Sequence, residues 1–214
     1  MRLIIFGPQG AGKGTQAARI GEKFSVPAIS TGDIFREAMA SGTELGELVE
    51  EIVNRGKLVP DDLALELIQK RLEEADTQAG WLLDGFPRNL EQARRLDRYL
   101  ETTGQHLDAA LLLEVSEEIT AHRIMGRRVC SQCGANYHVD APPQVDWKCD
   151  RCGGDVVARS DDQDEDAIRQ RLQTYLKETK PLGEYYEDKG LLRRIEGNGS
   201  RDEIFARVLE KVGR

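Results

Sequence analysis

The sequence predicts an α/β fold, with a parallel sheet covered by helices on both faces. Two observations predict it: short apolar runs alternate with amphipathic segments of helical period, and a glycine-rich loop joins the first apolar run to the first helical segment. A second polar segment follows another apolar run. Ligands of such sheets bind at the carboxyl ends of the strands, so both polar segments fall where a binding site is expected.

Five apolar runs are expected to form the strands of this sheet: Arg2–Phe6, Pro27–Ser30, Gly80–Asp84, Asp108–Val115 and Leu191–Glu196. Helical patterns lie between them, at Asp61–Glu74, Leu90–Glu101 and Glu117–Met125. Two segments interrupt the alternation. Residues 31–60 are helical in pattern, and residues 126–162 are rich in Cys, Gly, Pro and Asp. The second segment has too few aliphatic residues for a hydrophobic core and needs another source of stability.

The loop from Gly7 to Thr15 has the composition of a phosphate cradle. Its glycines let backbone N–H groups turn toward an anion, and the following helix adds positive potential at its N-terminus. Lys13 can reach the β- and γ-phosphates of a nucleotide. Gly14 stands where the general motif has Ser or Thr, so we assign Thr15 no direct bond to Mg²⁺. The candidate phosphate-binding residues are Gly10, Ala11, Gly12, Lys13, Gly14 and Thr15.

The second polar segment is Asp84-Gly85-Phe86-Pro87-Arg88. An aspartate at the end of a buried strand beside a phosphate loop is placed to hold Mg²⁺ through water. Arg88 can fork onto a phosphate. Phosphoryl transfer between two polyanions needs cationic donors on both sides, and no general base if the acceptor is an ionised phosphate. Further arginines near loops or helix ends fit this chemistry: Arg36, Arg123, Arg127, Arg159 and Arg171.

The four cysteines form two C-x₂-C pairs with 15 residues between them: Cys130 and Cys133, then Cys149 and Cys152. This spacing predicts a tetrahedral metal site, most often Zn²⁺, with Co²⁺ and Fe²⁺ as possible occupants. Four thiolates leave no open position, so the metal would be structural. His138 could replace a thiolate, disulfides could form in air, and a zinc ribbon that reads nucleic acid is the functional rival.

Composition narrows the class of partner. A net charge of −8 over 214 residues argues against nucleic acid, because clustered Lys and Arg are needed to hold a phosphate backbone. The apolar runs are too short to cross a bilayer, and no signal peptide is recognisable. We therefore expect a cytoplasmic protein that contacts no membrane.

With these motifs in view, the chain resembles the long-form bacterial adenylate kinases of the nucleoside monophosphate kinase family, over essentially its whole length. The resemblance rests on the loop at residues 7–15, Thr31-Gly32-Asp33 with Arg36, residues 57–62 and 84–88 with Gln92, Gly126-Arg127-Arg128, and Arg159 with Asp161-Asp162. It implies a P-loop kinase core of five parallel strands at residues 1–29, 60–125 and 163–214. It also implies an AMP-binding helical insertion at residues 30–59 and a metal-stapled lid at residues 126–162.

The resemblance assigns roles residue by residue. ATP would contact the loop residues Gly10 to Thr15, together with Arg127, Asn136, Tyr137 and Gly199. AMP would contact Thr31, Arg36, Lys57, Leu58, Val59, Gly85, Phe86, Pro87, Arg88, Gln92, Arg159 and Arg171. The catalytic set would be Lys13, Asp84, Arg88, Arg123, Arg127, Arg159 and Arg171. Two departures from the family pattern are Gln9, often proline, and an extra residue that leaves Arg169 as an alternative to Arg171.

The implied reaction is reversible phosphoryl transfer from Mg²⁺-bound ATP to AMP, giving two ADP, in a monomer. Three rivals remain at this point. One is a GTP:AMP phosphotransferase, and another is a kinase for UMP or CMP, against which Thr31 and Gln92 argue. The third, from a different class, is a P-loop nucleotide switch or a zinc-ribbon binding module.

Overall fold

The computed structural model describes residues 1–40, 42–55, 57–159, 162 and 165–213, and confirms the α/β class. Five of its strands form the main sheet: β1 (Arg2–Phe6), β2 (Ala28–Ser30), β3 (Trp81–Asp84), β4 (Ala109–Glu114) and β8 (Leu192–Glu196). The helices are α1 (Lys13–Phe24), α2 (Thr31–Ala40), α3 (Glu44–Asn54), α4 (Asp61–Leu72), α5 (Leu90–Thr102), α6 (Glu117–Met125), α7 (Glu165–Thr174), α8 (Leu182–Asp188) and α9 (Arg201–Val212). Two short helical turns are η1 (Ala75–Thr77) and the π-helical η3 (Tyr175–Thr179).

The main sheet is parallel, with the strand order β2-β3-β1-β4-β8. β1 is central and pairs with β3 on one side and β4 on the other. Its register sets Ile5 opposite Asp84, and β2 sets Ser30 opposite the same Asp84. The glycine loop, the start of α2 and the Asp84 segment therefore all leave the sheet at one edge, where a doubly wound sheet binds its ligand.

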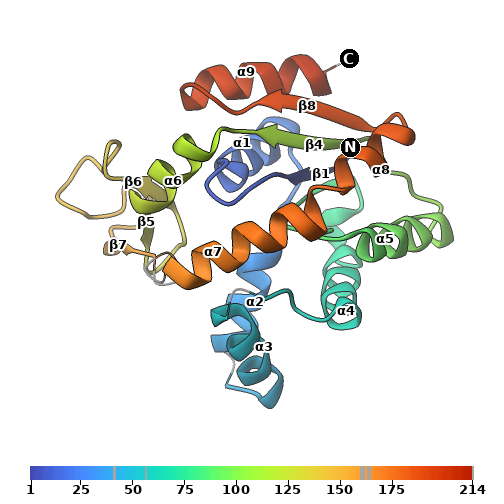
Figure 1. Ribbon diagram of the computed structural model, residues 1–214, viewed down its shortest axis with the longest axis horizontal. Coiled ribbons are helices and arrows are strands. Elements are labelled where there is room, and N and C mark those ends of the chain that lie inside the picture. Colours follow the sequence, from blue (N-terminus) through green and yellow to red (C-terminus); the bar gives the residue numbers. More distant parts are fainter. Residues whose placement is uncertain (41, 56, 160–161, 163–164, 214) are drawn as a thin grey trace.

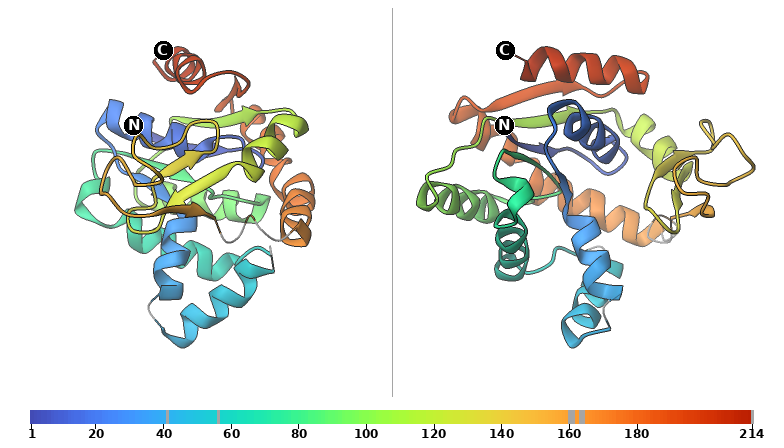
Figure 2. Two further views of the ribbon diagram at one scale, coloured as in Figure 1. Left: turned by 90° about the vertical axis from the view of Figure 1, so that its left-hand side faces the viewer. Right: turned by 180° about the vertical axis from the view of Figure 1, so that it is seen from behind.

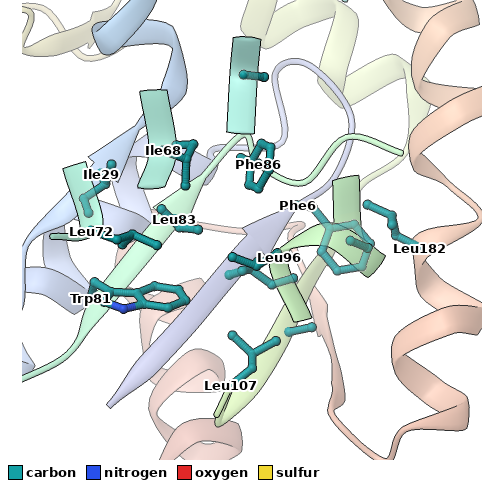
Figure 3. Close-up of a cluster of buried hydrophobic side chains, with 14 of the residues drawn as sticks. Phe6, Ile29, Ile68, Leu72, Trp81, Leu83, Phe86, Leu96, Leu107 and Leu182 are labelled. Atoms are coloured by element: carbon teal, nitrogen blue, oxygen red, sulfur yellow. The ribbon is translucent and has the colours of Figure 1, made fainter. Parts of the chain in front are cut away.

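Apolar side chains of period two fill both faces of this sheet. Leu3 and Ile5 of β1 face α1 and α9, whereas Ile4 and Phe6 face α4, α5 and α8. Figure 3 shows the cluster that contains Phe6, in which Trp81 and Leu83 of β3 and Leu96 of α5 are also buried. Strands buried on both faces explain the continuous apolar runs in the sequence.

Polar side chains cap the N-termini of several helices. Asn89, Ser116 and Ser200 each accept a hydrogen bond from a backbone N–H in the first turn of α5, α6 and α9. Ser200 and Glu203 form a reciprocal capping box. These caps satisfy N–H groups that have no partner within the helix, and so fix where each helix leaves its loop.

Two segments project from the core, α2 with α3 and the strands between α6 and α7 (Figures 1 and 2). Between Ser30 and Gly80, the described residues contain α2, α3, α4 and η1 and no strand, as expected. Between α6 and α7 lies an antiparallel sheet, hereafter the small sheet, of β5 (Arg127–Cys130), β6 (Asn136–His138) and β7 (Val156–Ala158). Its apolar cluster contains only one buried aliphatic residue, Val156, beside Cys130 and Cys149. Among the described residues no helix is long and apolar enough to cross a membrane.

We expect Leu83→Ala to lower the free energy of unfolding by about 2–5 kcal/mol, because it leaves a cavity in a close-packed layer. Leu83 is fully buried and pairs with Ile4 and Ile29 across two strand ladders. Urea denaturation measures the change. Leu176→Ala is the control, since that side chain is 46% exposed and should cost far less. Equal losses in the two variants would contradict this view of the core.

Candidate active site and metal centre

The glycine loop connects β1 directly to α1. Gly10 and Gly12 have φ of 79° and 91°, a region that favours glycine, and α1 begins immediately after Gly12. A Cβ at Gly10 would lie 2.6 Å from the carbonyl oxygen of Thr120 in α6, so the loop also packs closely against that helix. The loop is therefore held in the form that an anion cradle at a helix N-terminus requires.

Lys13 lies folded onto this loop. Its Nζ donates to the carbonyl oxygens of Gly7 at 2.9 Å and Pro8 at 2.8 Å. Burial lowers the pKa of Lys13 to about 8; Asp84 opposes the shift, and Arg88, Arg127 and Arg159 reinforce it. The charged groups that shift this pKa most are thus one anion and three cations. A bound polyphosphate would supply the missing negative charge.

Asp84 is the carboxylate on which the two polar segments converge. Burial raises its pKa, while Lys13, Arg88 and Arg159 act in the opposite direction. Gly14 lies beside this side chain, since a Cβ there would be 3.4 Å from Asp84 Oδ2 and 4.0 Å from the amide nitrogen of Asn136. A loop residue, a strand end and a residue of the small sheet therefore meet at one point.

Thr31, Gly85 and Arg88 form a compact group on the other side of Asp84. The Thr31 hydroxyl donates to the backbone oxygen of Asp84 at 3.2 Å, and Arg88 Nε donates to the Gly85 oxygen at 2.8 Å. Gly85 has φ of 88°, and a Cβ there would lie 2.6 Å from Thr31 Oγ1, so glycine is required on both counts. Phe86 is buried, and the Phe86–Pro87 peptide bond is cis. The segment orients the Arg88 guanidinium toward the carboxyl edge of the sheet.

Gln92 is buried, and its side chain is hydrogen-bonded at both ends of the amide. Its Oε1 accepts from the Arg88 N–H at 2.7 Å, and its Nε2 donates to Asp61 Oδ1 at 2.8 Å. Asn89 donates to the same Asp61 oxygen at 2.9 Å. Asp61 was not among the candidate residues, although it stands in the first turn of α4. Its function here is to position Gln92 and the start of α5.

Two of the remaining acceptor-side residues, Lys57 and Leu58, line an open cleft of about 400 Å³. Asn89 and residues of α7 and η3 complete its lining. Val59 is buried and does not line the cleft. Arg36 lies on α2, half exposed and paired with Asp33. The structure thus brings Lys57 and Leu58 to one cleft, whereas Arg36 holds a local carboxylate.

Arg123 connects the glycine loop to the loop before α9. Its guanidinium donates to the oxygens of Ala11 at 3.2 Å, Gly197 at 3.0 Å and Gly199 at 3.4 Å. Burial lowers the pKa of Arg123. The structure therefore brings Gly199 and Arg123 together beside the phosphate loop, although they are far apart in sequence.

Arg127 forms a two-point ion pair with Asp162. Its Nε and Nη2 lie 2.5 and 2.6 Å from the two carboxylate oxygens, and the Asp162 side chain is only 4% exposed. Gln9 of the glycine loop donates to Asp162 Oδ1 at 2.8 Å. Neither Gln9 nor Asp162 was a candidate site residue. The departure from proline at Gln9 was the available signal. Asp161 lies outside the described residues.

Arg159 and Arg171 act electrostatically on the same centre. Both lower the pKa of Arg88, after burial and in opposition to Asp84. Arg171 Nη2 donates to the Val53 oxygen of α3 at 3.3 Å, so α7 reaches across to the helical insertion. Arg169 instead is 68% exposed and pairs with Asp166 on its own helix. This geometry favours Arg171 over Arg169 as the arginine that serves the site.

The four cysteines gather at the tip of the small sheet. Cys130 Sγ lies 3.5 Å from Cys152 Sγ, and Cys133 Sγ lies 3.5 Å from Cys149 Sγ, with all four sulfurs within 4.8 Å of one another. A disulfide needs about 2.05 Å, whereas thiolates around one Zn²⁺ at about 2.3 Å stand roughly 3.8 Å apart. Gly134 and Gly153 adopt φ of 69° and 75° after each knuckle. The donor set fits a structural tetrahedral metal.

Tyr137 belongs to the surroundings of this cluster. Its hydroxyl donates to Cys149 Sγ at 3.4 Å and accepts from the Asp150 N–H at 2.8 Å. The bond to Cys149 is the largest cause of the raised pKa of Tyr137, about 12. The neighbouring Asn136, in contrast, approaches Gly14. Of the two residues expected near ATP, one side chain faces the phosphate loop and the other braces the cysteines.

A phosphate loop and a second cationic segment on one sheet edge, with charged residues from two projecting segments around them, define a P-loop phosphotransferase. Residues 5–191 match the family described as "Adenylate kinase". Relatives called "Adenylate kinase" include one from Thermoanaerobacter sp. (strain X514), 49% identical over all of this chain and 98% of its own length. Another, from Caldanaerobacter subterraneus subsp. tengcongensis, is 50% identical over 96% of this chain and 93% of its own. The chain belongs to the adenylate kinase family, as its motifs predicted.

The shifted pKa of Lys13 predicts a pH-dependent affinity for nucleotide. A bound polyphosphate favours charged Lys13, whose pKa is about 8 without it, so binding above pH 8 takes up a proton. Affinity for a non-hydrolysable ATP analogue should fall up to about tenfold per pH unit above 8. Calorimetric titrations in two buffers measure both effects. Lys13→Met should abolish the dependence and Lys23→Met should retain it. A flat wild-type profile from pH 7 to 9 would contradict the assignment.

Removing one thiolate tests the metal centre. We expect Cys130→Ser to lose bound metal by elemental analysis and to make the small sheet more sensitive to protease, because its apolar core is minimal. AMP affinity should change little, since most acceptor-side residues lie outside the small sheet and only Arg159 directly follows β7. Ser131→Ala, at an exposed position between the ligands, is the control and should keep the metal. Metal-free wild-type protein prepared under reducing conditions would refute the site.

Proposed function

We propose that the chain catalyses reversible phosphoryl transfer from Mg²⁺-bound ATP to AMP, yielding two ADP. Besides family membership, one observation carries this proposal: Lys13 of the phosphate loop and Arg88 of the acceptor side act on the same buried carboxylate, Asp84. A donor phosphate on the first and an acceptor phosphate on the second would meet above one strand edge. Positioning of this kind is the main source of catalysis in phosphoryl transfer.

The donor nucleotide is proposed to lie along the glycine loop. Residues from Gly10 to Thr15 would bind its phosphates through backbone N–H groups, and Lys13 would leave the Gly7 and Pro8 carbonyls for the β- and γ-phosphates. Arg123, already in contact with Gly199, would hold the phosphates, and Asn136 and Tyr137 would border the base with Gly199 behind it. Arg127 would exchange its Asp162 partner for phosphate.

The acceptor AMP is proposed to lie between α2, the Lys57–Val59 segment and the start of α5. Arg36 and Arg88 would hold its phosphate, and Thr31 with Gln92 would face the adenine. Gly85 to Pro87 would shape the floor. Gln92 accepts one bond from Arg88 and donates one to Asp61 here, so it would read the base through its second N–H and its second lone pair. The cleft lined by Lys57 and Leu58 supplies the space.

Charge stabilisation would then lower the barrier. Arg88, Arg159 and Arg171 would approach from the acceptor side, while Lys13, Arg123 and Arg127 would approach from the donor side. Mg²⁺ bound with the nucleotide would neutralise part of the phosphate charge. Asp84, an oxygen donor next to Gly14, is the residue that would hold it through water. Since the acceptor phosphate is already ionised, no side chain need act as a general base.

The three expected parts are proposed as working units. Residues 126–162 would be a lid that closes over the donor and excludes water, which would otherwise accept the phosphoryl group. A Zn²⁺ on the four cysteines would keep this small sheet rigid as it moves. Residues 30–59 would close over AMP, and residues 1–29, 60–125 and 163–214 would form the core. Both substrate sites are built from one chain, which favours a monomer.

GTP remains the alternative donor, because backbone contacts to a base discriminate weakly. Comparing turnover with ATP and GTP at saturating AMP decides between them. A coupled assay that detects no AMP-dependent ADP formation would reject the kinase proposal altogether.

We expect Arg88→Ala to reduce kcat/KM about 100- to 1000-fold, as when one preorganised donor to a transition state is removed. Initial rates at varied AMP and fixed Mg²⁺-ATP measure the loss. Arg98→Ala on α5 is the matched control. The Arg98 side chain is 65% exposed, and its nearest carboxylate oxygen, on Glu91, is 3.8 Å away. The kcat/KM of this variant should therefore equal that of wild type. A value for Arg88→Ala within about threefold of wild type would contradict the role given to Arg88.

A further inference from the structure

A second group of metal-ligating side chains, separate from the four cysteines, lies where α6 meets the small sheet. It consists of His122 on α6, His138 on β6 and Asp140 in the turn that follows β6. One ligand atom from each lies within 4.8 Å of the others. We propose that these three residues form a second site for a divalent transition metal such as Zn²⁺, joining α6 to the small sheet.

The distances fit a shared ion. His122 Nε2 lies 3.4 Å from Asp140 Oδ2, and His138 Nδ1 lies 3.3 Å from the same oxygen. Nitrogen and oxygen ligands at about 2.0–2.1 Å from a tetrahedral Zn²⁺ stand roughly 3.4 Å apart. Imidazole and carboxylate are ligands that such metals accept, and three protein ligands leave one position for water.

The proton positions of His138 also match those of a metal ligand. Its Nδ1 accepts the Asp140 N–H at 3.1 Å, so that atom carries the lone pair and faces Asp140 Oδ2. Its Nε2 lies 3.3 Å from the backbone oxygen of His122, to which it donates. A histidine that ligates a metal through one nitrogen usually donates the other N–H to a carbonyl or carboxylate. An ion would replace the weak Asp140 N–H contact.

The backbone holds the site together before any ion arrives. His138 and Ala141 exchange hydrogen bonds of 3.4 and 2.9 Å, which closes the turn that carries Asp140. Val139 donates to the oxygen of Gly126 at the end of α6, 2.9 Å away. A side chain at Gly126 would collide with the His138 ring, its Cβ 2.1 Å from Nε2, so glycine admits the ring here. The His122 and Asp140 side chains are 63% and 64% exposed, which leaves the site open to solvent ions.

Calorimetric titration of Zn²⁺ into nucleotide-free protein with its cysteine cluster already loaded tests the proposal. We expect wild type to bind a further ion, and His122→Ala and Asp140→Asn each to weaken that binding at least about tenfold. His106→Ala is the matched control, because His106 is an exposed histidine whose Nε2 lies 3.5 Å from a single aspartate, Asp108. Its affinity for the further ion should equal that of wild type.

Paramagnetic Ni²⁺, added to wild type, gives a second readout within one molecule. Ring proton signals of His122 and His138 should broaden at lower Ni²⁺ than those of His106. No binding beyond the cysteine cluster, equal weakening by His106→Ala, or equal broadening of all three histidines would overturn the proposal. In that case the cluster is only a pair of histidine–aspartate contacts.

Discussion

The concentration of positive charge around one buried carboxylate is the constraint on which the rest of this site depends. Lys13, Arg88 and Arg159 all act on Asp84, and the parallel register that sets Ile5 opposite Asp84 brings their segments together. Burial opposes charge on the lysine, on Arg88 and on the carboxylate alike. Of the printed charges that act most strongly on Lys13, one is this carboxylate and three are arginines. The folded protein therefore keeps an electrostatic demand that a polyphosphate can meet.

The scaffold that carries these charges is held by ordinary apolar packing and by close backbone contacts. Strands buried on both faces fix the sheet, and close backbone approaches at Gly10 and Gly85 fix the loops that leave it. The candidate site residues lie mainly at the end of β3, near the starts of helices, on the loops between them and on the segments that project from that frame. Stability and chemistry are thus separated along the chain: the core orders the edge of the sheet, and the edge carries the site.

Much of this arrangement was predictable from sequence because its signals are local. Apolar runs located all five strands of the main sheet to within a residue or two, and two C-x₂-C pairs located the cysteine cluster. The parts that could not be predicted depend on distant partners. The sequence around Gln92 does not indicate that its amide will donate a hydrogen bond to Asp61. The sequence around Tyr137 does not indicate that its hydroxyl will donate to the sulfur of Cys149. Gln9 and Arg127 likewise lie too far from Asp162 along the sequence for a local pattern to predict that they bind it.

Because Arg127 is already paired with Asp162, a nucleotide phosphate would have to displace a carboxylate in order to bind this arginine. The guanidinium already has an oriented anion, a buried carboxylate that Gln9 also holds. Arg36 is likewise paired with Asp33. Each arginine would therefore trade one anion for another, and Arg127, whose pair with Asp162 is mostly buried, would lose little water when phosphate arrives. Discrimination would then rest on a comparison of anions: only a ligand that engages several arginines at once would outcompete the carboxylates the chain supplies itself.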